Sequence, residues 1–131
     1  MQIPYEIASK SVIPAIRGMI SRGLLVREMT QSQIAAALGI TQPAVSKYLC
    51  EKRGRAIDLD HRDDVKKLAD IIADGIANQK LDRLQVANMI KELCDYVMRS
   101  GYMCSLHFEV DPQIKNTNCK ICMEPAVTPM V

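Results

Sequence analysis

The chain has 131 residues, of which 48% are hydrophobic, 24% charged and 4% aromatic, and its formal net charge is +2. This length allows one domain, or two very small ones that share a core, and is too short for a Rossmann or barrel enzyme. No apolar run approaches a membrane span, and residues 1–10 lack a signal-peptide pattern. We therefore expect an intracellular, cytoplasmic protein, in which five cysteines indicate metal or redox chemistry as readily as disulfides.

The net charge conceals two oppositely charged segments. Residues 1–55 contain eight Lys or Arg and three Glu, a charge of +5, whereas residues 56–131 contain nine basic and twelve acidic residues, a charge of −3. Such asymmetry is typical of a module that faces a polyanion joined to one that faces something else, although uneven surface patterning would look the same. We accordingly divide the chain into two predicted domains, residues 1–55 and residues 56–131, whose functions need a motif to support them.

Helical periodicity dominates the first of these segments. An apolar stripe formed by Ile13, Ile16 and Ile20 predicts one helix, which we expect Gly23 to bend or end.

Two short helices are expected next. Thr30, with Gln33 three residues later, has the pattern of a capping box, and Gly39 is expected to end this helix with a positive φ. Thr41 opens the following helix, whose first turn tolerates Pro43.

The second segment begins with a polar linker over residues 56–61 and continues with two amphipathic helices that end at residues 100–101. Their apolar stripes are Val65, Leu68, Ile72 and Ile76, then Leu84, Ala87, Ile90, Leu93 and Val97. The periodicity is lost beyond residue 101, where Pro112, Pro125 and Pro129 punctuate an irregular tail. The predicted fold is all-α: an N-terminal helix-turn-helix bundle, a C-terminal helical dimerisation region and an irregular Cys-rich tail.

Residues 31–49 carry the strongest local signal. The first short helix places Ile34, Ala35 and Leu38 on one face, and Val45 and Leu49 can close the core from the second helix. A simple helical hairpin with a glycine turn would use the same apolar pattern, but it does not explain the polar face. The combination resembles the helix-turn-helix of the lambda-repressor-like regulators, and this resemblance implies binding to double-stranded DNA.

The second helix of such a motif enters the major groove, and its N-terminal residues meet base edges. Gln42 can pair with adenine, Ser46 can contact either base class, and Lys47 can reach guanine or phosphate. The remaining predicted contacts are to the sugar–phosphate backbone or a minor groove, from Gln31, Gln33, Thr41, Arg53 and Arg55.

A broader similarity covers roughly residues 3–55. The segments PYE (4–6), IPAIR (13–17), TQPAVSKYL (41–49) and KRG (52–54) are similar to archaeal transcriptional regulators that are sometimes fused to a thiamine-phosphate synthase domain. This chain has no room for that ligand domain, so thiamine phosphate is not expected as its effector. The resemblance implies a regulator and leaves its signal open.

Four cysteines lie in the last 38 residues with the spacing Cys-x9-Cys-x14-Cys-x2-Cys. They are Cys94, Cys104, Cys119 and Cys122. Four thiolates can hold a [4Fe–4S] cluster or a tetrahedral Zn²⁺ ion, and a single tight Cys-x2-Cys pair favours the cluster. Disulfides and free thiols remain alternatives.

Two other residues are ambiguous. His107 can replace one thiolate, or it can be a surface histidine or one that lies behind the metal ligands. Cys50 is either a small apolar residue near the core or an oxidisable thiol. The predicted function is a homodimeric, sequence-specific transcriptional regulator that responds to redox, oxygen or iron through its cluster. A regulator with a structural zinc, an iron–sulfur electron carrier or enzyme subunit, and a protein-binding scaffold are the alternatives.

Overall fold

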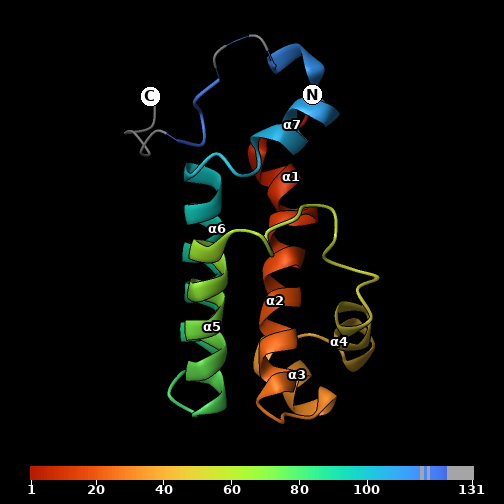
Figure 1. Ribbon diagram of the computed structural model, residues 1–131, viewed down its shortest axis with the longest axis vertical. Helices are drawn as coiled ribbons and strands as arrows, with labels where there is room; N and C mark the ends of the chain where they lie inside the picture. The colour runs from red at the N-terminus through yellow and green to blue at the C-terminus, as the bar shows by residue number, and fades with distance from the viewer. Residues whose placement is uncertain (116, 118, 124–131) are drawn as a thin grey trace.

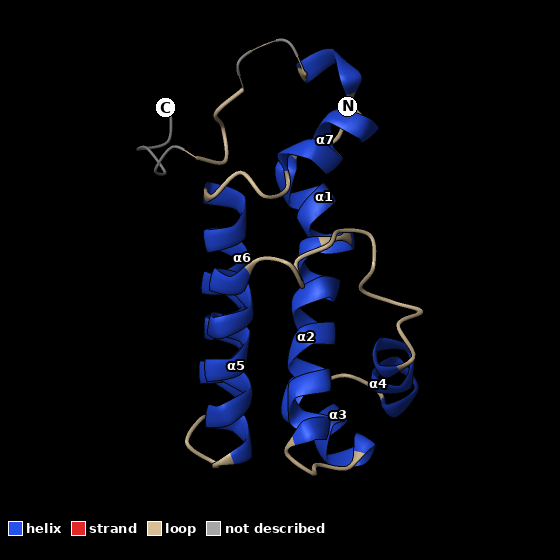
Figure 2. Cartoon of the chain, viewed as in Figure 1, coloured by secondary structure: helices blue, strands red, loops and turns tan. Residues whose placement is uncertain are grey.

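The structure is a computed structural model that describes residues 1–115, 117 and 119–123. All regular structure in these residues is helical, as predicted (Figure 2). The helices are α1 (Pro4–Lys10), α2 (Val12–Val26), α3 (Gln31–Leu38), α4 (Gln42–Leu49), α5 (Asp63–Ala77), α6 (Arg83–Arg99) and α7 (Cys104–Val110), followed by the 3-10 turn η1 (Pro112–Ile114). Pro125 and Pro129 of the predicted tail lie outside the described residues. None of the described helices combines the length and apolar character that a membrane span requires.

Helix α2 is the central element of the fold. It packs most extensively against α5 and also contacts α1, α3, α4 and α6 (Figure 1). Ile16 and Ile20 of the predicted stripe are fully buried, as is Leu24, while Ile13 is half-buried. Each fully buried aliphatic side chain contributes about 1.5–3 kcal/mol, so α2 organises the core.

Gly23 does not end the helix, because α2 continues through it to Val26. A Cβ atom on Gly23 would lie only 3.2 Å from Cβ of Ala73 in α5. The glycine therefore permits close approach of two helices and is tolerated within the helix for that reason.

Helices α5 and α6 form a hairpin that packs on α2. Val65, Ile72 and Ile76 of the α5 stripe are buried, in agreement with the prediction. The α6 stripe is partly wrong: Leu84 is 80% exposed and Ala87 is also exposed. The buried face of α6 consists of Val86, Leu93, Cys94, Val97 and Met98.

The segments on either side of this hairpin are more ordered than predicted. The linker is not wholly polar, because Leu59 is 2% exposed and joins the core. The region beyond residue 101 is not wholly irregular, since it contains α7 and η1. Residues 1–55 and the second segment contribute to one continuous cluster of buried side chains, which runs from Ile7 to Met103.

Candidate functional site

The two short helices α3 and α4 are joined by a turn whose geometry is set by local residues. Thr30 and Gln33 cap α3 reciprocally: the Gln33 N–H donates to Thr30 Oγ1 (3.1 Å), and the Thr30 N–H donates to Gln33 Oε1 (2.9 Å). Gly39 ends the helix in the left-handed region, with φ 65° and ψ 34°. These two predicted features are confirmed, and they fix where the chain enters α4.

Helix α4 has one buried and one exposed side. Its first turn is capped by Thr41, whose Oγ1 accepts a hydrogen bond from the Ala44 N–H (3.2 Å). Val45 and Tyr48 are buried, and the helix packs on α2 and α3. The opposite side exposes polar groups to solvent, as the sequence predicted.

The predicted DNA-contacting residues fall into two groups. Gln42 and Lys47 are exposed on α4, Ser46 is half-buried beside them, and Thr41 precedes them at the N-cap. Gln31 and Gln33 occupy the first turn of α3, where Gln33 Oε1 is already used by the cap. The structure thus brings six of the eight residues onto α3, α4 and the turn between them.

The two arginines that follow α4 are held by protein groups. The Arg53 guanidinium lies 5.8 Å from the centroid of the Tyr48 ring, a cation–π distance. The Arg55 Nη1 atom lies 2.7 Å from Asp60 Oδ2, and this hydrogen bond is the main reason that the pKa of Arg55 is raised. Arg55 consequently ties the linker together, whereas Arg53 retains an exposed charge.

Sequence reasoning missed Arg83, the first residue of α6, which lies against the Gly39 turn. A Cβ atom on Gly39 would be 2.7 Å from Nη2 of Arg83. No local sequence signal indicates this contact, because the two residues lie in different halves of the chain.

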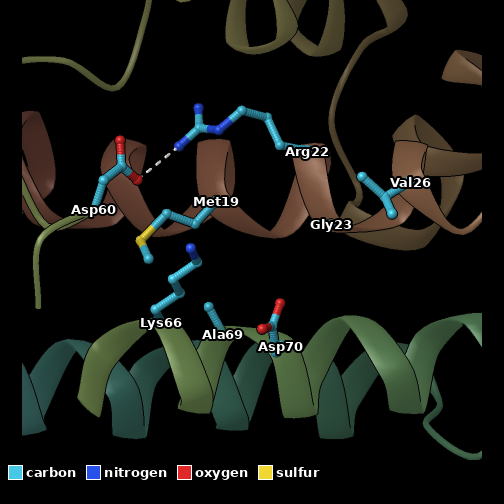
Figure 3. Close-up of a pocket in the computed structure, with 8 residues that line it drawn as sticks. All are labelled: Met19, Arg22, Gly23, Val26, Asp60, Lys66, Ala69 and Asp70. Atoms are coloured by element: carbon cyan, nitrogen blue, oxygen red, sulfur yellow. Dashed lines mark hydrogen bonds and ion pairs between the residues drawn. The ribbon is translucent and has the colours of Figure 1, made fainter. Parts of the chain in front are cut away.

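A half-open pocket of about 210 Å³ lies between α2 and α5 (Figure 3). Its lining carries both signs of charge, from Arg22, Asp60, Lys66 and Asp70. The Arg22 Nη2 atom lies 3.1 Å from Asp60 Oδ1, so Arg22 and Arg55 share the same carboxylate. The Arg22–Asp60 ion pair joins α2 to the linker. These two charges in the pocket therefore have a structural role.

A second hollow, of about 180 Å³ and mainly apolar, lies between α5 and α6. Its lining includes Ile71, which is 57% exposed, together with Leu68, Met89 and Tyr96. Helices α5 and α6 are on the other side of α2 from α4 (Figure 1). A partner that covered this hollow would therefore leave α4 accessible.

Two of the four predicted cysteine ligands come from neighbouring segments: a Cβ atom on Gly101 would lie 3.8 Å from Cys104 Sγ and 2.5 Å from Cε of Met123, the residue after Cys122. Burial is the main reason that the pKa of Cys122 is raised. Cys94 is buried on α6, with its Sγ 4.0 Å from Met98 Sδ, and burial raises its pKa to about 11. Within residues 1–115, 117 and 119–123, no three His, Cys, Asp or Glu side chains are arranged to hold a metal ion. The four-thiolate site therefore stays a prediction.

Two interpretations of single residues need correction. Cys50 is exposed at the end of α4 and does not lie near the core, because the apolar face of that helix ends before it. His107 is buried and not on the surface, and its Nε2 lies 3.1 Å from the Gln2 carbonyl oxygen. Its ring thus attaches α7 to the N-terminal segment.

A polar contact that the sequence did not reveal joins α5 to the segment leading to Cys104. The hydroxyl groups of Tyr96 and Tyr102 both donate to Asp64 Oδ2, at 2.5 and 2.7 Å. These two donors, Tyr96 first, hold the pKa of Asp64 below its ordinary value. The Arg62 guanidinium lies 4.2 Å from the centroid of the Tyr102 ring and completes the group.

Comparison of the sequence with protein-family models, with curated proteins and with solved structures gave no match.

Proposed function

We propose that this protein is a sequence-specific DNA-binding transcriptional regulator of the helix-turn-helix type. The observation that carries the proposal is the α3–turn–α4 unit: two capped short helices, a left-handed glycine between them, and a second helix whose polar side faces solvent. A helix presented in this way fits the major groove with its N-terminal residues towards the base edges.

Each exposed residue of α4 has a distinct role in this proposal. Gln42, in the first turn, pairs with the N6/N7 edge of an adenine, and Ser46, one turn later, contacts an adjacent base. Lys47 contacts guanine or phosphate. At the start of α4 the Gln42 N–H is the backbone donor available to a phosphate, because Pro43 has no N–H and the Ala44 and Val45 N–H groups donate to Thr41.

The test is a selection from a pool of randomised duplexes, followed by affinity measurements on the enriched sequence and a scrambled one. We expect Gln42→Ala to lower the preference for the enriched sequence by about 1–3 kcal/mol and to leave binding to the scrambled duplex nearly unchanged. Gln113→Ala, at an exposed glutamine of η1, is the matched control. No enrichment by the wild-type protein, or unaltered selectivity of Gln42→Ala, would contradict the proposal.

We further propose that the metal-loaded protein holds a [4Fe–4S] cluster on Cys94, Cys104, Cys119 and Cys122, with Zn²⁺ as the alternative. The position of Cys104 near the segment that carries Cys122, together with the Cys-x2-Cys spacing of Cys119 and Cys122, supports it. Binding requires thiolates, so Cys94, whose pKa is raised to about 11 by burial, must lose its proton to ligate the metal. Such a cluster supplies redox chemistry, whereas zinc supplies only a cross-link.

Anaerobic purification with metal analysis and a visible spectrum separates these alternatives. A brown protein that bleaches in air and contains iron supports the cluster; a colourless protein with one equivalent of zinc overturns it. Cys119→Ser should lose the metal, whereas Cys50→Ser, at the exposed cysteine of α4, should retain it. An iron-loaded protein that binds no duplex would instead favour the electron-carrier alternative.

Regulation would require that the state of the cluster alters DNA affinity, and α6 is the element able to connect the two. Its first residue, Arg83, contacts the Gly39 turn, and Cys94 lies further along the same helix. Duplex affinity is therefore expected to differ between the loaded, oxidised and metal-free forms. Equal affinity in all three would remove the sensing part of the proposal.

The apolar hollow between α5 and α6 supports a homodimer, because a second copy could cover Ile71 and Tyr96 while both α4 helices remain exposed. Sedimentation of the wild-type protein should give a dimer, and Ile71→Glu should give a monomer. Leu84→Glu, at the exposed leucine on another face of α6, serves as the control. A monomeric wild-type protein at micromolar concentration would contradict this interface.

A further inference from the structure

Arg83 lies where a DNA-binding surface would extend beyond α3 and α4. Its guanidinium is packed against the backbone of Gly39: a Cβ atom there would be 2.7 Å from Nη2, 3.1 Å from Nε and 3.3 Å from Cζ. Gly39 is two residues before Thr41, the N-cap of α4. The contact therefore places a positive charge from α6 beside the turn that leads into the proposed reading helix.

The backbone that carries Arg83 is held in place by several contacts. Asp82 and Gln85 cap α6 reciprocally, each backbone N–H donating to the other side chain at 2.8 Å. Leu81 is packed on Gly75 so closely that a Cβ atom there would lie 2.7 Å from Leu81 Cδ1. The Lys80 N–H donates to the Gly75 carbonyl oxygen at 2.9 Å. The α5–α6 corner (residues 78–83) is thus a fixed platform, and little backbone ordering is needed on binding.

The charge on Arg83 is available to a ligand. Arg22, Arg27 and Arg55 each lie within 3.5 Å of an aspartate oxygen, whereas Arg83 has no ion pair within the described part of the chain. Arg83 is exposed, and so is Lys80 on the same corner. The carboxylate nearest in sequence, Asp82, is occupied by the helix cap.

We propose that Arg83 contacts a phosphate of the bound duplex, so that the DNA-binding surface includes the α5–α6 corner as well as α3 and α4. The inference rests on the proposed function. A guanidinium suits this role because its planar set of donors matches phosphate oxygens, and because the Gly39 contact already restricts its orientation. The competing explanation is purely structural: a positive charge near the C-terminus of α3 stabilises that helix.

Salt dependence distinguishes these explanations, because each phosphate contact contributes about one unit to the slope of log affinity against log salt concentration. The experiment measures the affinity of the full chain for its enriched duplex and for a scrambled one between 50 and 200 mM KCl, about the range over which phosphate contacts are revealed. Arg83→Gln should weaken binding to both duplexes by a similar factor, about fivefold, and lower the slope by about one. Arg83→Lys, which retains the charge, should keep the slope.

Arg99→Gln is the matched control, since Arg99 is an exposed arginine at the other end of the same helix (Figure 1). The Arg99→Gln variant should show the wild-type slope of log affinity against log salt concentration. If Arg83→Gln lowers the melting temperature yet leaves slope and affinity unchanged, the structural explanation holds and the proposal is overturned. If the wild-type protein binds no duplex, the proposed function itself is overturned. This outcome differs from failure of the Arg83 proposal, in which the wild-type protein binds and Arg83→Gln binds equally well.

Discussion

The two ends of the molecule are stabilised in different ways. The α3–α4 end (residues 30–50) is fixed by backbone caps at Thr30 and Thr41, by a left-handed glycine, and by the fully buried Ile34 and Val45. The cysteine end (residues 94–115, 117 and 119–123) lies at the opposite end of the long axis (Figure 1). There, the contacts that hold the chain are long-range: Tyr96 and Tyr102 donate to Asp64, His107 of α7 contacts the Gln2 carbonyl oxygen, and Met103 is buried in the core.

In the proposed function, this difference means that one end would meet its ligand preformed and the other would not. The α3–α4 end presents its polar face without rearrangement, so a duplex would meet a preformed surface. At the cysteine end, Cys104 lies near the segment that carries Cys122, while Cys94 is buried on α6 beside Met98. A metal centre on all four cysteines would have to complete the folding of that end.

The largest expected effect tests the packing of the α3–α4 end. Ile34 is fully buried, and Ile34→Ala should lower the free energy of unfolding by about 2–5 kcal/mol through lost burial and a residual cavity. Leu84→Ala, at a leucine that is 80% exposed, should change it by less than about 0.5 kcal/mol. Urea denaturation provides both values. Equal losses would mean that the packing of these two residues has been misassigned.

The second prediction concerns the turn. Gly39→Ala should cost about 1–2 kcal/mol because an L side chain is strained at φ 65°, and the new methyl group would also displace the Arg83 guanidinium. Gly101→Ala, also at positive φ but at the cysteine end, carries a similar backbone penalty. Only the Gly39 variant should weaken DNA binding; weakening by both would show that the effect is general loss of stability.

A smaller effect is expected from the cap of α4. Thr41→Ala removes the acceptor of the Ala44 N–H and should destabilise the protein by about 1 kcal/mol, whereas Thr41→Ser should restore most of that loss. Thermal unfolding of the three proteins at one pH measures the difference. A neutral Thr41→Ala variant would show that the cap does not fix α4.

The smallest effect is a pH dependence confined to the cysteine end. Because the pKa of Asp64 is lowered in the folded protein, its contribution is complete above the ordinary carboxyl pKa of about 4 and is lost as the pH falls through the lowered value. Asp64→Asn should remove this acid-sensitive contribution. Near-ultraviolet circular dichroism of the tyrosines between about pH 2 and 6 reports it. An identical acid transition in the wild-type and variant proteins would exclude Asp64 as its source.

Local signals were the ones that could be predicted from the sequence. The Thr30–Gln33 cap, Gly39 and the Thr41 cap each depend on residues within one helical turn, and all three are confirmed. The helical stripes of α2 and α5 were predicted for the same reason.

The features that the sequence did not predict depend on packing between residues far apart in the chain. Gly23 was expected to bend or end a helix. Its role is close approach to Ala73, and the sequence gives no local signal of this because Ala73 is far along the chain. Helix α6 has apolar residues on two faces, and only its contacts with α2 and α5 determine that Val86 is buried while Leu84 is exposed. The contacts of Asp64 with two tyrosines and of Arg83 with Gly39 likewise have no local signature.

The most direct test of the central claim is a ¹H–¹⁵N correlation spectrum recorded while the enriched duplex is added to the labelled protein. Binding through the α3–α4 end predicts that the perturbed amide signals concentrate in residues 30–50 and around Arg83, with residues 102–115 little affected. Perturbations centred on α7 or on the α5–α6 hollow, with α4 unchanged, would contradict the account.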